Sequence, residues 1–167
     1  MRLSIIFISL FFFSMKTSAQ KPERLTLRNA FQECISKERT ESFYKKLAST
    51  SSNEIIKHGY KGAVMALRAK YSSNPFKKYN YCKEGLIILS KAIADSPQDL
   101  ELRYLRLIIQ SNIPSFLGMN CNLNEDKNMI IDNIEQEKDL QLKKIISEFL
   151  MKSDICTDQE KKSLALS

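Results

Sequence analysis

The chain has 167 residues, of which 43% are hydrophobic and 27% are charged, and Lys and Arg outnumber Asp and Glu by 26 to 19. This composition fits one globular domain with a buried core. The basic excess is mild, so it does not indicate nucleic acid as a partner.

The N-terminus carries an export pattern. Arg2 precedes the apolar run 3–13, and the small residues Thr17 and Ala19 follow it. The run is shorter than the roughly 20 residues that a membrane-spanning helix needs, so it is typical of a cleavable secretory signal peptide. We therefore expect a signal peptide over 1–19, cut after Ala19, and a mature chain that is periplasmic or secreted. No later stretch is apolar enough for an integral membrane segment, so none is expected.

The mature chain, residues 20–167, predicts a single all-α domain of about seven to eight helices. Its apolar residues recur at intervals of three and four rather than two, which is the helical period. The first helix is predicted over 23–37 and a shorter one around 43–47, before the polar break 49–53. The next, over 54–71, has the clearest apolar stripe: Ile56, Tyr60, Ala63, Val64, Leu67 and Tyr71.

Two Pro-containing pairs predict the next helix starts. Asn74-Pro75 and Ser96-Pro97 each place an N-cap residue before a Pro, which the first turn of a helix accepts. The helix after Asn74 is expected to direct one face to the core, and so is the helix after Ser96; these faces comprise Phe76, Tyr79, Cys82, Leu86, Leu89 and Ile93, and then Leu102, Leu105 and Ile109.

The segment 113–120 interrupts this series with both turn residues and large apolar residues. We expect its Phe116, Leu117 and Met119 to plug the end of the core; the alternative is an exposed recognition loop. Asn124 is then expected to cap a helix, and a further apolar stripe covers 142–150. Finally, 157–160 reads TDQE, a capping box that starts a short last helix.

The four cysteines are compatible with disulfides, because their number is even and the predicted compartment is oxidising. The two pairings favoured by position are Cys34 with Cys82 and Cys121 with Cys156; free buried thiols are the alternative for the first pair. With a single histidine, His58, and no CxxC spacing, a metal site is not expected.

Charge is unevenly distributed along the mature chain. Residues 21–113 hold 17 basic and 9 acidic side chains, whereas 114–167 hold 7 and 10. This asymmetry indicates either a basic surface for an acidic partner or two parts that attract each other within one fold. We favour the second interpretation, because the basic residues are scattered along helices and form no block.

Gly85, Leu89, Ala92 and Pro97 have the spacing of the second helix and exit turn of a tetratricopeptide repeat. Residues 54–112 therefore resemble that family, and the resemblance implies an antiparallel helix-pair array. The interval from Gly62 to Gly85 is longer than in that family. The stretches 97–106 and 112–118 and the pair Glu125-Asp126 are also similar to small exported bacterial helical proteins without an assigned activity, which implies no function.

Arg103 and Arg106 are the strongest candidates for a binding site. They are spaced i and i+3 on one helix, so both guanidinium groups can reach one carboxylate, and the resemblance implies that this helix lines a groove. The predicted binding surface consists of Arg103, Arg106, Tyr104, Asn112, Phe116 and Leu117. Internal pairing of the arginines with Glu84, Glu101, Glu125 or Asp126 is the alternative, and for these two residues we favour it over ligand binding.

The sequence contains none of the catalytic motifs that we sought, which were a hydrolase elbow, a phosphate-binding glycine loop, HExxH and a dinucleotide fingerprint. We therefore expect no enzyme and no cofactor. The favoured function is a protein–protein interaction module that binds an acidic or C-terminal segment of a protein partner in an envelope complex. The alternatives are a small envelope-directed hydrolase and a disulfide-stabilised structural protein without a ligand groove.

Overall fold

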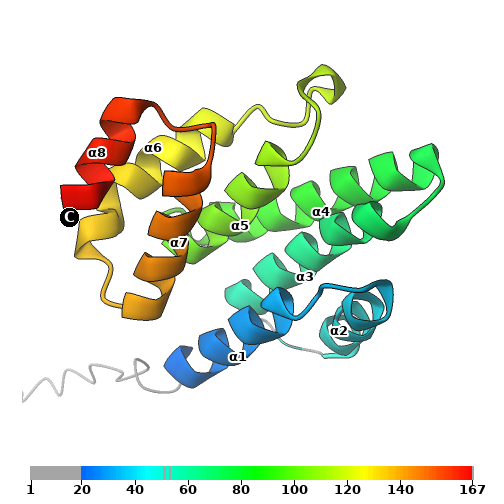
Figure 1. Cartoon of the computed structure of the whole chain (residues 1–167). Coiled ribbons are helices and arrows are strands. Elements are labelled where there is room, and N and C mark those ends of the chain that lie inside the picture. The colour runs from blue at the N-terminus through cyan, green and yellow to red at the C-terminus, as the bar shows by residue number, and fades with distance from the viewer. Residues whose placement is uncertain (1–19, 51, 53, 167) are drawn as a thin grey trace, which may run out of the picture.

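The computed structural model describes residues 20–50, 52 and 54–166, and the expected signal peptide lies outside them. In this part of the chain every regular element is helical, and the helices form one compact arrangement (Figure 1). They are α1 (Gln20–Gln32), α2 (Lys37–Ser49), α3 (Ile55–Leu67), α4 (Pro75–Asp95), α5 (Leu100–Ser111), α6 (Leu123–Asn133), α7 (Leu140–Lys152) and α8 (Asp158–Leu166), with short 3-10 turns η1 (Arg68–Tyr71), η2 (Ser115–Leu117) and η3 (Ile134–Gln136). The predicted all-α fold of about eight helices is confirmed.

Two predicted helix starts are present as expected. The Asn74 side chain accepts a hydrogen bond from the Lys77 backbone N–H at 3.1 Å, and Pro75 opens α4. At α8, the Thr157 hydroxyl accepts from the Glu160 N–H at 3.2 Å while the Glu160 carboxylate accepts from the Thr157 N–H at 2.7 Å. These reciprocal bonds satisfy backbone donors that a helix end leaves open.

Three other boundaries differ from the predictions. Ser96 ends α4, and Asp99 caps α5 instead, because its carboxylate accepts from the N–H groups of both Glu101 and Leu102. The first helix ends at Gln32 and not at residue 37, and a second helix, α2, begins after its N-cap Ser36. The cap predicted at Asn124 lies inside α6, which begins at Leu123.

The core consists of two hydrophobic clusters that share α5. Leu102, Leu105 and Ile109 point into the first cluster, with buried side chains of α1 to α4. Leu100 and Leu107 point into the second, with buried side chains of α6, α7 and α8. Helix α5 is therefore buried on nearly all sides and positions residues of both halves.

Helices α3 and α4 cross with their backbones in contact at two glycines. A Cβ atom added to Gly85 would lie 2.5 Å from both the Gly62 carbonyl oxygen and the Ala66 nitrogen. Gly85 is one of the residues that carry the repeat-like spacing in the sequence. Phe76, by contrast, is 80% exposed, because at about 100° per residue it lies roughly 140° around α4 from the buried Leu89. Tyr79 is also exposed.

Candidate functional site

Arg103 and Arg106 converge on one carboxylate, as their spacing predicts, but that carboxylate belongs to the same chain. Arg106 donates from Nε to Asp126 Oδ2 at 2.6 Å and from Nη2 to Oδ1 at 2.8 Å. Arg103 donates from Nη1 to the same Oδ1 at 2.9 Å and to Glu125 Oε1 at 2.6 Å. The hydrogen bond from Arg103 holds the pKa of the Glu125 carboxyl below its ordinary value.

Both arginines are enclosed by this arrangement. Their exposed fractions are 8% and 5%, and Asp126 is 0% exposed. Two further donors are also used: Arg103 Nε donates to the Pro97 carbonyl and Arg106 Nη1 to the Ser90 hydroxyl. This geometry corrects the expectation of an arginine-lined groove, because internal partners neutralise both groups. The structure shows the alternative, internal pairing of the two arginines with Glu125 and Asp126.

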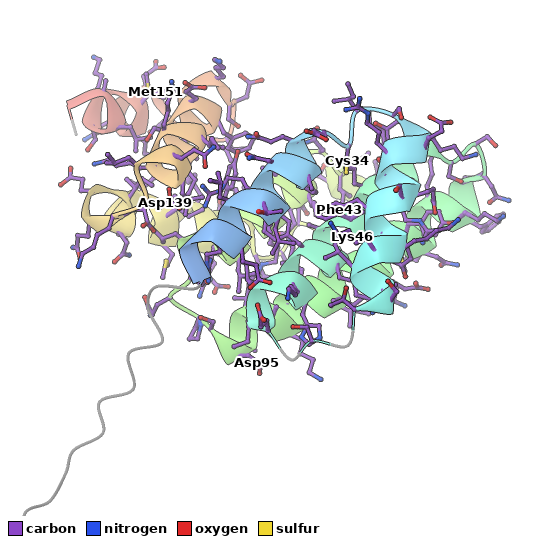
Figure 2. All side chains as sticks on the ribbon, turned by 90° about the horizontal axis from the view of Figure 1, so that it is seen from below. Cys34, Phe43, Lys46, Asp95, Asp139 and Met151 are labelled. Carbon is purple, nitrogen blue, oxygen red and sulfur yellow. The ribbon has the colours of Figure 1, made fainter. Side chains whose placement is uncertain are left out.

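A second buried network, centred on Glu101, was not anticipated as a unit. Glu101 Oε1 accepts from Arg28 Nε at 2.9 Å and from the Tyr60 hydroxyl at 2.7 Å, and Oε2 accepts from Arg24. Arg28 also donates to Asp139 at the start of α7, and Figure 2 shows Asp139 next to α1. Burial raises the pKa of the Tyr60 phenol. One network thus joins α1, α3, α5 and α7.

Several ion pairs of these networks join the basic part of the sequence to the acidic part. Arg28, Arg103 and Arg106 belong to the basic part, 21–113, and their partners Asp139, Glu125 and Asp126 belong to the acidic part, 114–167. The favoured interpretation, attraction between two parts of one fold, agrees with this geometry.

An apolar cleft of about 250 Å³ lies between α1, α3, α5 and α7. Phe31, Leu105, Leu142 and Ile145 contribute to its walls, and Arg28, Tyr60 and Glu101 of the Glu101 network also line it. The only carboxylate in this lining is Glu101, which accepts hydrogen bonds from three donors. Glu101 is thus ion-paired with Arg24 and Arg28.

Tyr104 and Asn112 of the predicted surface have local roles. The Tyr104 ring packs edge to face on Phe149 with 5.5 Å between centroids. Burial raises the pKa of Tyr104 to about 12. Asn112 is exposed at the end of α5, where its amide donates to the Ile108 carbonyl at 2.8 Å.

Phe116 and Leu117 lie in a loop that projects from the body of the protein between α5 and α6 (Figure 1). Phe116 is 85% exposed and Leu117 is 36% exposed, so they do not plug the core. The flanking residues contact the core instead, because Ile113 is buried in the first cluster and Met119 packs against it. The expected plug is therefore wrong for Phe116 and Leu117, which lie in an exposed loop.

Hydrogen bonds hold the Phe116 loop, residues 113–120, in a defined conformation. The Leu117 N–H donates to the Pro114 carbonyl and the Gly118 N–H to the Ser115 carbonyl, each at 3.0 Å. Gly118 has φ +65°, a conformation that glycine adopts without strain. The buried Gln110 side chain donates to the Met119 carbonyl at 2.9 Å. The exposed phenyl ring is thus carried on an ordered turn.

The cysteines form no disulfide in the structure, which corrects the expected pairings of Cys34 with Cys82 and Cys121 with Cys156. Cys34 is buried in the first cluster and Cys156 in the second, Cys82 is partly buried and Cys121 is exposed. Burial raises the thiol pKa of Cys34, Cys82 and Cys156, so these three groups are poor nucleophiles.

A polar pocket of about 210 Å³ was missed by sequence reasoning. Lys37, Arg68 and Lys77 line it from α2, η1 and α4, and they form no motif because they are far apart in the chain. The only sequence signal was the general basic excess of 21–113.

Among the described residues, no group of three or more His, Cys, Asp or Glu side chains is arranged to hold a metal ion. Within the same residues, no helix has the length and apolar character to cross a membrane. Comparisons with protein-family models, with curated proteins and with solved structures found no match.

Proposed function

We propose that this protein is an exported protein–protein interaction module and that it engages its partner through the Phe116 loop. The observation that carries the proposal is the 85% exposed Phe116 on an ordered turn. The export pattern at the N-terminus supplies the compartment, periplasmic or secreted.

Displaying Phe116 in water has a cost that binding would recover. Burying a Phe side chain is worth about 1.5–3 kcal/mol relative to leaving it exposed. The fixed turn also reduces the ordering entropy that the loop would lose on association. Aromatic anchors that enter a partner's pocket dominate the energetics of many interfaces.

The loop also suggests the chemistry of the partner. Residues 113–120 contain no charged side chain, and the two arginines that suggested an acidic or C-terminal segment are neutralised internally. We therefore propose an apolar pocket on the partner as the receptor for Phe116, in place of an acidic segment.

The hydrolase alternative has no comparable support, because the carboxylate in the apolar cleft, Glu101, is ion-paired with Arg24 and Arg28. The structural-protein alternative relied on disulfides, and the four thiols are free. Neither alternative is favoured by a specific observation.

The test compares Phe116→Ala with Phe76→Ala, which removes another strongly exposed phenyl ring. Both variants are used beside wild type to capture partners from the protein's own cell envelope, and binding of each captured protein is then measured with purified components. We expect Phe116→Ala to weaken binding at least about tenfold, or about 1.4 kcal/mol, and Phe76→Ala to leave it unchanged. Equal binding by wild type and Phe116→Ala would refute the proposal.

A further inference from the structure

The polar pocket beside η1 differs from the buried networks because its cations are not all neutralised. Lys37, Arg68 and Lys77 line it together with a single carboxylate, Glu41. Lys37 and Lys77 are exposed and form no ion pair with another described residue. The lining side chains therefore carry an excess of two positive charges.

Arg68 is fixed at the pocket wall by neighbours on several sides. Its guanidinium carbon lies 4.3 Å from the centre of the Tyr44 ring and 4.5 Å from that of Tyr81. Its Nε donates to Glu41 Oε1 at 2.7 Å and its Nη1 contacts Met65 Sδ. Nη2 donates to no other described residue. The group is thus positioned before any ligand arrives, which lowers the entropy lost on binding.

Hydroxyl groups accompany the cations. The side chains of Ser73 and Tyr81 line the pocket, and their hydroxyls make no hydrogen bond to another described residue. A pocket of about 210 Å³ is below the roughly 300–1,000 Å³ of sites for drug-sized ligands. The ligand that complements this lining is small, anionic and able to hydrogen-bond to hydroxyls.

The helix ends add to the positive potential. Helix α2 begins at Lys37 and α4 begins at Pro75, so both N-terminal ends lie at the pocket. The partial positive charge of a helix N-terminus favours an anion within the first turn. The two helix ends therefore add to the positive potential of Lys37, Arg68 and Lys77, and these three side chains define the site.

From these observations we infer that this pocket binds a small hydroxylated anion, a carboxylate- or phosphate-bearing molecule of the size of an acidic sugar. The Arg68 guanidinium and the Lys37 and Lys77 ammonium groups would bind the anionic group, and the Ser73 and Tyr81 hydroxyls would contact ligand hydroxyls. This site is separate from the Phe116 loop and does not depend on the function proposed for it.

The test measures binding of glucuronate, glucose 6-phosphate and neutral glucose to the purified protein at low ionic strength, by calorimetry. The variant is Lys37→Gln/Lys77→Gln, which leaves the Arg68 contacts intact and removes two exposed charges. The matched control is Lys45→Gln/Lys83→Gln, which removes two exposed lysines of the same helices outside the pocket lining.

We expect saturable binding of at least one of the two anions, no binding of glucose, about tenfold weakening in the pocket variant and little change in the control. Preference for glucuronate or for glucose 6-phosphate identifies the anionic group. Absence of saturable binding by both anions, equal weakening in the two double variants, or equal binding of glucose would overturn the inference.

Discussion

Replacing Asp126 with Asn tests whether the arginine pair of α5 is committed to the fold. The carboxylate is 0% exposed and accepts three hydrogen bonds from Arg103 and Arg106. The amide keeps the shape, but it removes the negative charge and turns one acceptor into a donor that faces a guanidinium group. Two buried cations would then share only Glu125, whose side chain is 55% exposed.

The expected loss is large because breaking a buried ion pair leaves charge uncompensated, at about 3–5 kcal/mol. Typical domains have about 5–15 kcal/mol of stability in total. For a chain of this length such a loss lowers the melting temperature by roughly 6–20 °C. Urea unfolding followed by circular dichroism, together with calorimetric melting, provides both quantities.

Asp132→Asn is the matched control, since Asp132 lies on the same helix, is exposed and forms no ion pair with a described residue. It should change stability by less than about 0.5 kcal/mol. If Asp126→Asn behaved like this control, the buried pairs would not hold the fold together, and Arg103 and Arg106 would again become candidates for ligand binding.

Three further changes test other parts of the structure. Gly85→Ala should destabilise the protein in urea unfolding, because the new Cβ would meet backbone atoms of α3. Gly to Ala inside a helix ordinarily stabilises by about 0.5–1 kcal/mol, so a gain in stability would contradict the close crossing of α3 and α4. Tyr104→Phe should reduce the fall in melting temperature between pH 7 and pH 11. Burial raises the pKa of Tyr104 to about 12, whereas the phenol of the unfolded chain has a pKa of about 10, so it ionises first and favours unfolding. Equal falls in melting temperature in both proteins would contradict this reasoning. In thiol titration without reductant, Cys121 should react in the folded protein and the other three cysteines only after denaturation. Fewer than four reactive thiols in denaturant would indicate a disulfide.

The sequence predicted those features that depend on local chemistry. The caps at Asn74 and at Thr157 with Glu160 involve hydrogen bonds within three residues, so composition and spacing were sufficient. The buried stripe that contains Leu102 and Leu105 also followed from helical periodicity. Ser96 was misassigned because Asp99, three residues later, competes more effectively for the same role.

Features that depend on the approach of distant segments could not be predicted in this way. The i,i+3 spacing correctly brought Arg103 and Arg106 to one point, but whether that point was solvent or Asp126 depends on how α6 packs on α5. Phe116 could equally have been drawn into the core, since its neighbours Ile113 and Met119 are. The pocket lined by Lys37, Arg68 and Lys77 exists only because three separate elements meet.

The burial of α5 on nearly all sides determines how the protein responds to proteolysis. Because α5 supplies side chains to both hydrophobic clusters and both ion networks, neither half should retain its structure without it, and thermal unfolding should occur as one cooperative transition. Protease cleavage within the exposed segment 114–118 would break the chain while leaving these contacts in place. The two fragments should therefore stay associated as a nicked, folded complex that separates only in denaturant.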